Sequence, residues 1–251
     1  MITVKALIIR EEPSGETSKN VYALTAERGV IRIYVRGGYK SRKNSAATQL
    51  FVYSEICAEE KKNPRGETYY YLNSAEPINL FFDLRLDVYK TALSAYLTDI
   101  LYYSRIEFAS DKNDILRLTL NTLYYINEGK KDRALLKSIF EFRLLCDTGL
   151  RPNLIGCSQC YKYEDEKMYF NMYSGDLKCE ECCNNKESLV GFVFDPKMLY
   201  IVRHIALTDF ERLFAIEIAP KYQKQLTEFT ERYVKYHYNE KFDTLLFYNS
   251  L

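Results

Sequence analysis

Two C-x2-C pairs lie close together in the middle of this chain. Cys157 and Cys160 form the first pair, Cys179 and Cys182 form the second, and 18 residues separate them. Two thiolates three positions apart can face one ion across a tight turn, and two such turns complete the tetrahedron that Zn²⁺ prefers. The spacing therefore predicts one structural zinc ion bound by these four cysteines.

Other interpretations of the cysteines remain open. They could be free thiols without a metal, whereas a thioredoxin-type redox site needs only one such pair and fits two pairs poorly. The N-terminal apolar run is too short for a signal peptide, and no stretch approaches the roughly 20 apolar residues of a membrane span. We therefore expect a cytoplasmic protein, in which thiols stay reduced and disulfides are disfavoured. Cys183 could replace Cys182 as fourth ligand, although the C-x2-C spacing favours Cys182.

The first 75 or so residues show the alternation that is typical of β-strands. The stretch "NVYALTAERGVIRIYVRGG" predicts a hairpin that turns at 26–29 and places Ile31, Ile33 and Val35 on one face. Three further strands are expected in "ITVKALIIR", "QLFVYSEICAE" and "TYYYLNSAE". Five short strands with a basic loop between the third and the fourth predict a small β-barrel.

From about residue 77 the apolar pattern changes to a helical period. Apolar residues recur at helical spacing from 84 to 103, and two further helices are expected at 114–126 and 132–146. Between the two cysteine pairs, Met168, Phe170 and Met172 alternate before a turn at 174–176, which is typical of a zinc-ribbon hairpin.

The helical pattern resumes after the cysteines. Asp195 and Pro196 are suited to the N-cap and first position of a helix. Thr208 and Glu211 resemble a capping box, and a long final helix is expected around 222–233. The order of elements predicts an α+β protein: a five-stranded barrel, then an α-helical domain that carries an inserted four-cysteine zinc module.

The net charge of +1 conceals two segments of opposite sign. Residues 1–50 contain nine bases against four acids, whereas 153–190 contain four bases against seven acids. A polyanion partner is therefore expected at the N-terminal segment. The acidic cysteine stretch repels phosphate, and we interpret its zinc as structural support for a segment too small to bury its own core.

Basic and tyrosine side chains alternate in "RGVIRIYVRGGYKSRKNSA". Bases on one strand face can contact phosphates, and tyrosine rings can stack on unpaired bases, so the stretch favours nucleic-acid binding without sequence preference. The alternative is a solvated strand face without a ligand. The candidate DNA-binding residues are Arg28, Arg32, Tyr34, Arg36, Lys40, Arg42 and Lys43.

Motifs of common enzymes are absent from the sequence. There is no phosphate-binding loop of the P-loop type, no dinucleotide fingerprint and no H-E-x-x-H motif. The two histidines, His204 and His237, have no visible nucleophile partner. We expect a protein that is not an enzyme.

The arrangement of these features resembles the RecO family of bacterial recombination mediators. The resemblance is carried by "LIIREEPSGETSKNVYALTAERGVIRIYVRGGYKSRKNSA", "YYYLNSAEPINLFFDL", "FEFRLLCDTGLRPNLIGCSQC" and "CEEC", and it spans nearly the whole chain. It implies that the barrel is an oligonucleotide-binding (OB) fold. The expected segments are an OB-fold domain at 1–78, helical parts at 79–152 and 191–251, and the zinc-binding module at 153–190.

The resemblance also implies a function. Members of this family bind single- and double-stranded DNA, anneal complementary strands and help to load RecA onto single strands coated by single-stranded-DNA-binding protein. Expected partners are therefore DNA, RecR and the single-stranded-DNA-binding protein, with RecA indirectly and no membrane. The family's basic loop matches Arg36, Lys40, Arg42 and Lys43. An alternative is a protein–protein adaptor whose barrel docks a partner, with DNA binding only in the complex.

Overall fold

The chain forms two compact units in the computed structural model, which describes residues 1–251 except 41, 63, 65, 67, 105 and 184–190. Unit 1 comprises Met1–Lys131 with Phe242–Leu251, and unit 2 comprises Asp132–Lys241. For Arg42 and Lys43 only the backbone is described. The division into four segments expected from the sequence stays a prediction about how the chain folds.

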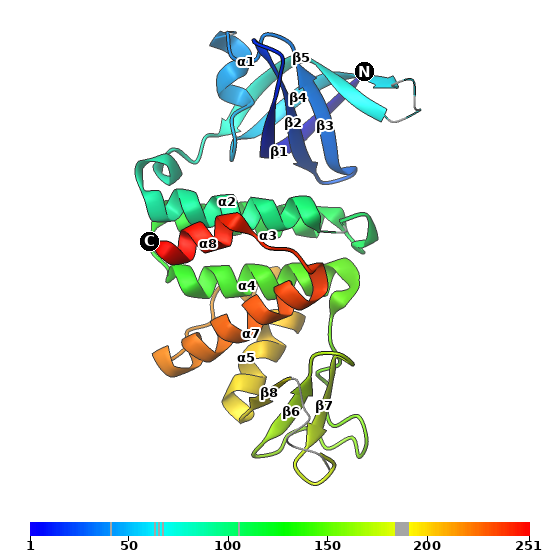
Figure 1. Cartoon of the computed structure of the whole chain (residues 1–251), viewed down its shortest axis with the longest axis vertical. Helices are drawn as coiled ribbons and strands as arrows, with labels where there is room; N and C mark the ends of the chain where they lie inside the picture. The colour runs from blue at the N-terminus through cyan, green and yellow to red at the C-terminus, as the bar shows by residue number, and fades with distance from the viewer. Residues whose placement is uncertain (41, 63, 65, 67, 105, 184–190) are drawn as a thin grey trace. The chain divides into compact units, whose positions relative to one another are not determined.

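Unit 1 begins with the predicted five-stranded barrel. The strands are β1 (Ile2–Ser14), β2 (Ser18–Thr25), β3 (Gly29–Val35), β4 (Tyr53–Lys62) and β5 (Thr68–Asn79). They close in the order β1-β2-β3-β5-β4, with β3 and β5 parallel and the other pairs antiparallel (Figure 1). The hairpin turn between β2 and β3 lies where the sequence predicts it.

The alternation of β3 separates the barrel core from its surface. Ile31, Ile33 and Val35 point inward and are buried, whereas Arg32 and Arg36 are exposed. Burying the apolar face of each strand contributes roughly 25 cal/mol per Å² of apolar area removed from water. The strand pattern in the sequence therefore determined which residues of β3 face solvent.

Lys19 is one of the nine bases in residues 1–50, but it does not lie on the surface. Its side chain is buried, and Nζ lies 2.7 Å from Glu11 Oε2 and 2.7 Å from the carbonyl oxygen of Thr48. A buried ammonium group requires such partners because it has lost its hydration. Lys19 therefore supports the barrel and is not available to a polyanion.

Helices complete unit 1. The connection from β3 to β4 contains the short helix α1 (Arg42–Ala47), and β5 leads through the 3₁₀ helix η1 (Phe82–Leu86) to α2 (Val88–Tyr103). After η2 (Ile106–Phe108), α3 (Lys112–Glu128) ends at Gly129, whose φ of 68° is the left-handed conformation that favours glycine. The C-terminal helix α8 (Asp243–Ser250), which the sequence analysis missed, packs along α2.

Unit 2 combines helices with a small sheet. Its helices are α4 (Arg133–Leu145), which continues as the π-helical turn η3 (Cys146–Leu150), α5 (Pro196–Leu207), α6 (Phe210–Leu213) and α7 (Pro220–Tyr238). Its strands β6 (Met168–Asn171), β7 (Asp176–Cys179) and β8 (Gly191–Phe194) pair in the order β7-β6-β8. No described helix of the chain combines the length and the apolarity that a membrane crossing requires.

The helix caps and the hairpin that the sequence predicts for unit 2 are partly confirmed. The Asp195 side chain caps α5, with Pro196 at its first turn, and β6 and β7 form the predicted hairpin. The capping box at Thr208 is wrong, because Thr208 ends α5 and Asp209 precedes α6. The long helix near 222–233 is confirmed as α7, although α8 follows it.

Aromatic rings attach the cysteine-bearing hairpin to the helices of unit 2. Phe170 of β6 is fully buried, stacks on Phe194 of β8 at 5.7 Å between ring centroids, and meets Phe229 of α7 at 5.5 Å. Such pairs contribute about 0.5–1.5 kcal/mol each beyond their area burial. The hairpin therefore shares the core of the helices.

A buried charge network joins α4 to α7. Lys137 Nζ lies 2.8 Å from Glu141 Oε1 and 2.8 Å from Glu231 Oε1, and Thr230 donates to Glu141 Oε2 at 2.6 Å. Burial alone would lower the pKa of Lys137, but the two carboxylates raise it above its ordinary value. The lysine therefore stays charged inside the unit.

We predict that Glu141→Gln lowers the free energy of unfolding by about 3 kcal/mol, because Lys137 would lose one of its two countercharges inside the protein. Urea unfolding measures the change. Glu228→Gln is the matched control, since Glu228 and Arg232 form an exposed pair at 3.6 Å whose loss should cost less than about 1 kcal/mol. Equal effects of the two substitutions would contradict this account of α4 and α7.

Candidate nucleic-acid interface and metal centre

Arginine and tyrosine side chains lie in rows across the outer surface of the barrel. Residues opposite one another in paired strands point to the same face, and the register pairs Arg10 with Tyr22 and Tyr22 with Arg32. In the neighbouring row, Tyr34 of β3 pairs with Tyr71 of β5, and their ring centroids lie 5.1 Å apart. Four strands, β1, β2, β3 and β5, thus present cations and aromatic rings on one surface.

Helix α2 adds Tyr102 to this surface. The Arg10 guanidinium carbon lies 4.2 Å from the centroid of the Tyr102 ring, and Tyr22 meets the same ring edge-on at 5.1 Å. We call Arg10, Tyr22, Arg32, Tyr34, Tyr71 and Tyr102 the tyrosine–arginine face.

Glu12 fixes two members of the tyrosine–arginine face. It accepts a hydrogen bond from Tyr22 Oη at 3.0 Å and another from Arg10 Nε at 2.9 Å. Burial and then the Glu12 carboxylate raise the pKa of Tyr22 to about 12. Tyr22 is therefore a neutral hydrogen-bond donor at physiological pH, and its ring is held in place.

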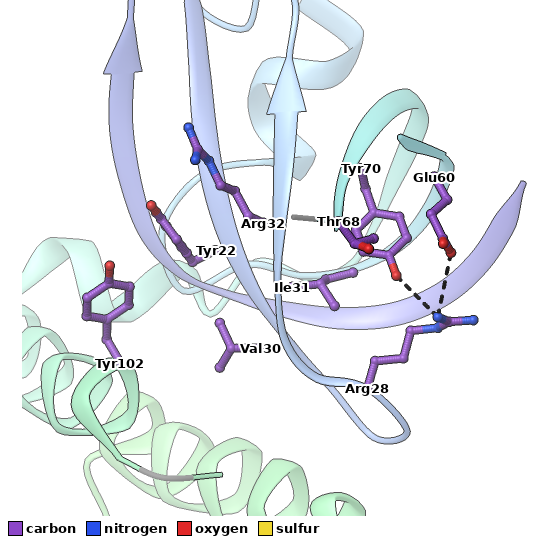
Figure 2. A pocket seen from close by; sticks show the side chains of 9 residues that line it. All are labelled: Tyr22, Arg28, Val30, Ile31, Arg32, Glu60, Thr68, Tyr70 and Tyr102. Carbon is purple, nitrogen blue, oxygen red and sulfur yellow. Dashed lines mark hydrogen bonds and ion pairs between the residues drawn. The ribbon is translucent and has the colours of Figure 1, made fainter. Parts of the chain in front are cut away.

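The same surface is hollowed beside the β2–β3 turn, where a cavity of about 720 Å³ lies (Figure 2). Arg28 Nη1 donates to Tyr70 Oη at 3.2 Å and lies 3.9 Å from Glu60 Oε2. This volume can accept a nucleotide-sized group, with guanidinium groups for phosphate and phenol rings for a base. The lining residues are Tyr22, Arg28, Val30, Ile31, Arg32, Glu60, Thr68, Tyr70 and Tyr102.

The residues that the sequence proposed for DNA binding occupy three places. Arg28 and Arg32 line the cavity, and Tyr34 lies in the next row. Arg36 and Lys40 are exposed beyond the end of β3, where Lys40 N bonds to Gly37 O at 2.9 Å across a turn. The side chains of the last two candidates, Arg42 and Lys43, lie outside the described part of the chain.

Sequence reasoning missed four members of the tyrosine–arginine face. Two of them could have been found from the sequence. A hairpin that turns at 26–29 places Tyr22 opposite Arg32, and the hairpin between β1 and β2 places Arg10 opposite Tyr22. Tyr71 and Tyr102 could not have been found in this way, since the β3–β5 pairing and the packing of α2 join residues distant in the sequence.

The four cysteines of the two C-x2-C pairs come together in unit 2. The Sγ atoms of Cys157, Cys160, Cys179 and Cys182 all lie within 4.8 Å of one another, and those of Cys160 and Cys179 are 3.6 Å apart. Zn–S bonds of about 2.3 Å in a tetrahedron separate the sulfurs by about 3.8 Å. The four residues can therefore hold one metal ion, and Cys183 lies outside this group.

Backbone hydrogen bonds shape the first cysteine pair into a tight loop. Cys157 N donates to Lys162 O at 2.9 Å, and Tyr161 N donates to Cys157 O at 2.9 Å. Burial raises the pKa of the Cys157 thiol, but the backbone N–H groups of Cys160, Cys179 and Gln159 outweigh it and lower the value to about 6. The loop therefore favours the thiolate form that a metal ligand requires at Cys157. At Cys160 the backbone of Lys162 lowers the pKa, but hydrogen bonds with Cys179 and Cys157 raise it above its ordinary value.

The remaining cysteines have different surroundings. Cys146 is buried, and burial raises the pKa of its thiol to about 12, which makes it unreactive. None of the seven cysteines, all of which lie in described parts of the chain, forms a disulfide.

Two family models match the chain. The one described as "Recombination protein O N terminal" matches residues 1–81, and "Recombination protein O C terminal" matches residues 85–245. A protein named DNA repair protein RecO from Caldicellulosiruptor saccharolyticus is 28% identical over 235 residues, which cover 93% of this chain and 92% of that protein. The protein of the same name from Acetivibrio thermocellus is 25% identical over 252 residues, covering 100% and 97%.

We predict that Gly156→Ala impairs the first cysteine loop. An added Cβ would lie 2.8 Å from Lys162 O and 3.2 Å from Tyr161 O, both backbone atoms, so the loop would have to open. Such overpacking costs about 1–3 kcal/mol. Faster hydrogen exchange at the Cys157 and Tyr161 amides would measure it. Ser158→Ala is the control in the same loop, and equal exchange in the two variants would contradict the prediction.

Proposed function

This chain belongs to the RecO family, and from that premise we propose that it is a DNA-binding recombination mediator in DNA repair. The observation that carries the proposal is the tyrosine–arginine face together with the exposed basic side chains that follow β3. Arg32, Arg36 and Lys40 form no ion pair within the described part of the chain, so their charges are available to phosphate. A surface that combines cations with aromatic rings suits a nucleic acid whose nucleobases are unpaired and accessible.

The proposed mode of binding combines two kinds of contact. Basic side chains of the β2–β3 turn, of β3 and of the loop that follows it contact phosphates and give affinity without sequence preference. They are Arg28, Arg32, Arg36, Lys40, Arg42 and Lys43. Tyr34, with Tyr71 beside it, stacks on a base that is not paired. A protein that holds single strands in this way leaves their base edges free, which favours annealing of complementary strands.

The finer steps of the proposed function follow the family. We propose that the protein anneals complementary single strands and, with RecR, helps to load RecA onto DNA coated by single-stranded-DNA-binding protein. It acts without catalysis of its own, in the cytoplasm, on both single- and double-stranded DNA.

A second candidate function is favoured by the carboxylates on the same surface. Glu12 and Glu60 lie among the arginines and would repel phosphate, while they suit a protein partner with its own bases. In this alternative the barrel is an adaptor that docks RecR, and DNA binding arises only in the complex.

We further propose that the four-cysteine centre binds one structural Zn²⁺. The four sulfurs are the ligand set that Zn²⁺ prefers in closed structural sites, and the metal would connect β7 to the loop before β6. The acidic residues around it, including Glu180 and Glu181, argue against a phosphate contact there.

We predict that replacing Arg32, Arg36 and Lys40 together with alanine flattens the salt dependence of single-stranded DNA binding. Each phosphate contact contributes about −0.7 to the slope of log affinity against log salt, so the slope should change by about 2. Fluorescence anisotropy titrations at several salt concentrations measure it. Tyr34→Ala should weaken binding by about 1–3 kcal/mol per stacked base and leave the slope unchanged.

The control variant replaces Lys197, Lys221 and Lys224, which removes the same charge from exposed positions of unit 2. It should leave the slope as it is in the unmodified protein. If the barrel variant also leaves the slope unchanged but no longer binds RecR, the adaptor function replaces the DNA-binding function.

The zinc proposal predicts one zinc per chain by elemental analysis. Cys179→Ser should abolish stoichiometric zinc, because a closed structural site takes all four of its ligands from the protein. Cys183→Ser should retain it. Loss of zinc from Cys183→Ser would show that Cys183, and not Cys182, is the fourth ligand.

A further inference from the structure

Arg203 of helix α5 binds the backbone on both sides of the first cysteine pair. Its Nε donates to Leu154 O at 2.8 Å, and its Nη2 donates to Ile155 O at 3.0 Å and to Tyr163 O at 2.6 Å. Only 7% of the residue is exposed. One side chain thus joins the two ends of the loop that carries two of the four cysteines.

The three carbonyls satisfy a guanidinium group that has lost its hydration. The Tyr163 ring adds to them, because the Arg203 guanidinium carbon lies 3.9 Å from its centroid, and Glu164 Oε2 lies 4.0 Å from Nη1. A buried charge requires such partners, and the planar fork of arginine can reach several acceptors at fixed angles. All of these contacts of the Arg203 guanidinium group are therefore with the segment that contains the first cysteine pair.

The location of these contacts bears on metal binding. Leu154 and Ile155 come just before Cys157, and Tyr163 comes three residues after Cys160. A loop that is fixed at both ends has fewer conformations to lose when its thiolates close on an ion. Release of the ends would let both sulfurs move apart.

We propose that Arg203 is a positioning residue of the metal centre, which holds the first cysteine loop in its metal-binding shape although it contacts no ligand sulfur. The proposal rests on the zinc site proposed above and extends that site from four cysteines to helix α5. Partners of this kind, one step removed from the ligands, typically alter metal affinity 10–100-fold.

The test is the rate at which the full-length, zinc-loaded protein transfers zinc to an excess of a chromogenic chelator. Arg203→Lys keeps the positive charge, but an ammonium group cannot reproduce the fork that joins three carbonyls. We expect zinc release about 10–100-fold faster than from the unmodified protein. Arg232→Lys is the matched control, because Arg232 lies in the same unit, pairs with Glu228 and covers the Phe192 ring at 4.7 Å. Its release rate should be unchanged.

Two further variants grade the effect. Tyr163→Leu removes the ring over the guanidinium but keeps the backbone carbonyl, so zinc release should accelerate less than in Arg203→Lys. Tyr163 is largely exposed, so this variant tests the proposal even if Arg203→Lys does not fold. Glu164→Gln removes only the long contact and should leave the rate unchanged.

Cobalt substitution separates positioning from a general loss of structure. Saturated with Co²⁺, Arg203→Lys should show the tetrahedral thiolate absorption of the unmodified protein but require more metal to reach it. If the unmodified protein holds one zinc and Arg203→Lys releases it at the same rate, the role of Arg203 is overturned and the zinc site stands. Equal acceleration in Arg232→Lys also overturns it. If the unmodified protein holds no zinc, the zinc site itself fails.

Discussion

The short parallel pairing of β3 with β5 closes the barrel, and the candidate nucleic-acid interface depends on it. Without this pairing β3 would be an open edge with unsatisfied backbone groups. Closure places Tyr71 beside Tyr34 and brings Tyr70 within reach of the Arg28 side chain. The pairing thus holds together tyrosine rings that are distant in the sequence. Because these rings lie on a closed barrel, they lose little conformational freedom when a ligand binds.

Charge is divided between the two units in a way that the net value of +1 hides. Exposed bases follow β3 in unit 1, while acids surround the cysteine centre in unit 2. Interactions between exposed charges are screened beyond about 10 Å at moderate salt, so the local surface matters more than the total. A nearly neutral chain can therefore present a surface for a polyanion. In unit 2 the charge of Arg203 has a structural role, because its guanidinium group is buried and donates to backbone carbonyls of the first cysteine loop.

The sequence predicted the features that depend on local pattern. The alternation of β3, the turn at 26–29, the cap at Asp195 and the spacing of the cysteines were each sufficient to place a strand, a turn, a helix start and a cluster of sulfurs. Contacts between distant segments were not predictable. Helix α8, the buried Lys137 network and Tyr102 on the barrel surface follow from packing, and Lys19 was counted as surface charge although Glu11 and Thr48 bind it inside the protein.

Photochemical crosslinking shows whether the barrel surface contacts unpaired nucleobases. A single-stranded oligonucleotide would be irradiated with the full-length protein, and crosslinked peptides would be identified by mass spectrometry. We expect adducts on the tyrosines of the barrel surface, with Tyr34 and Tyr71 foremost. Adducts confined to the acidic segment 153–190, or stable DNA binding without any adduct on the barrel, would contradict this expectation.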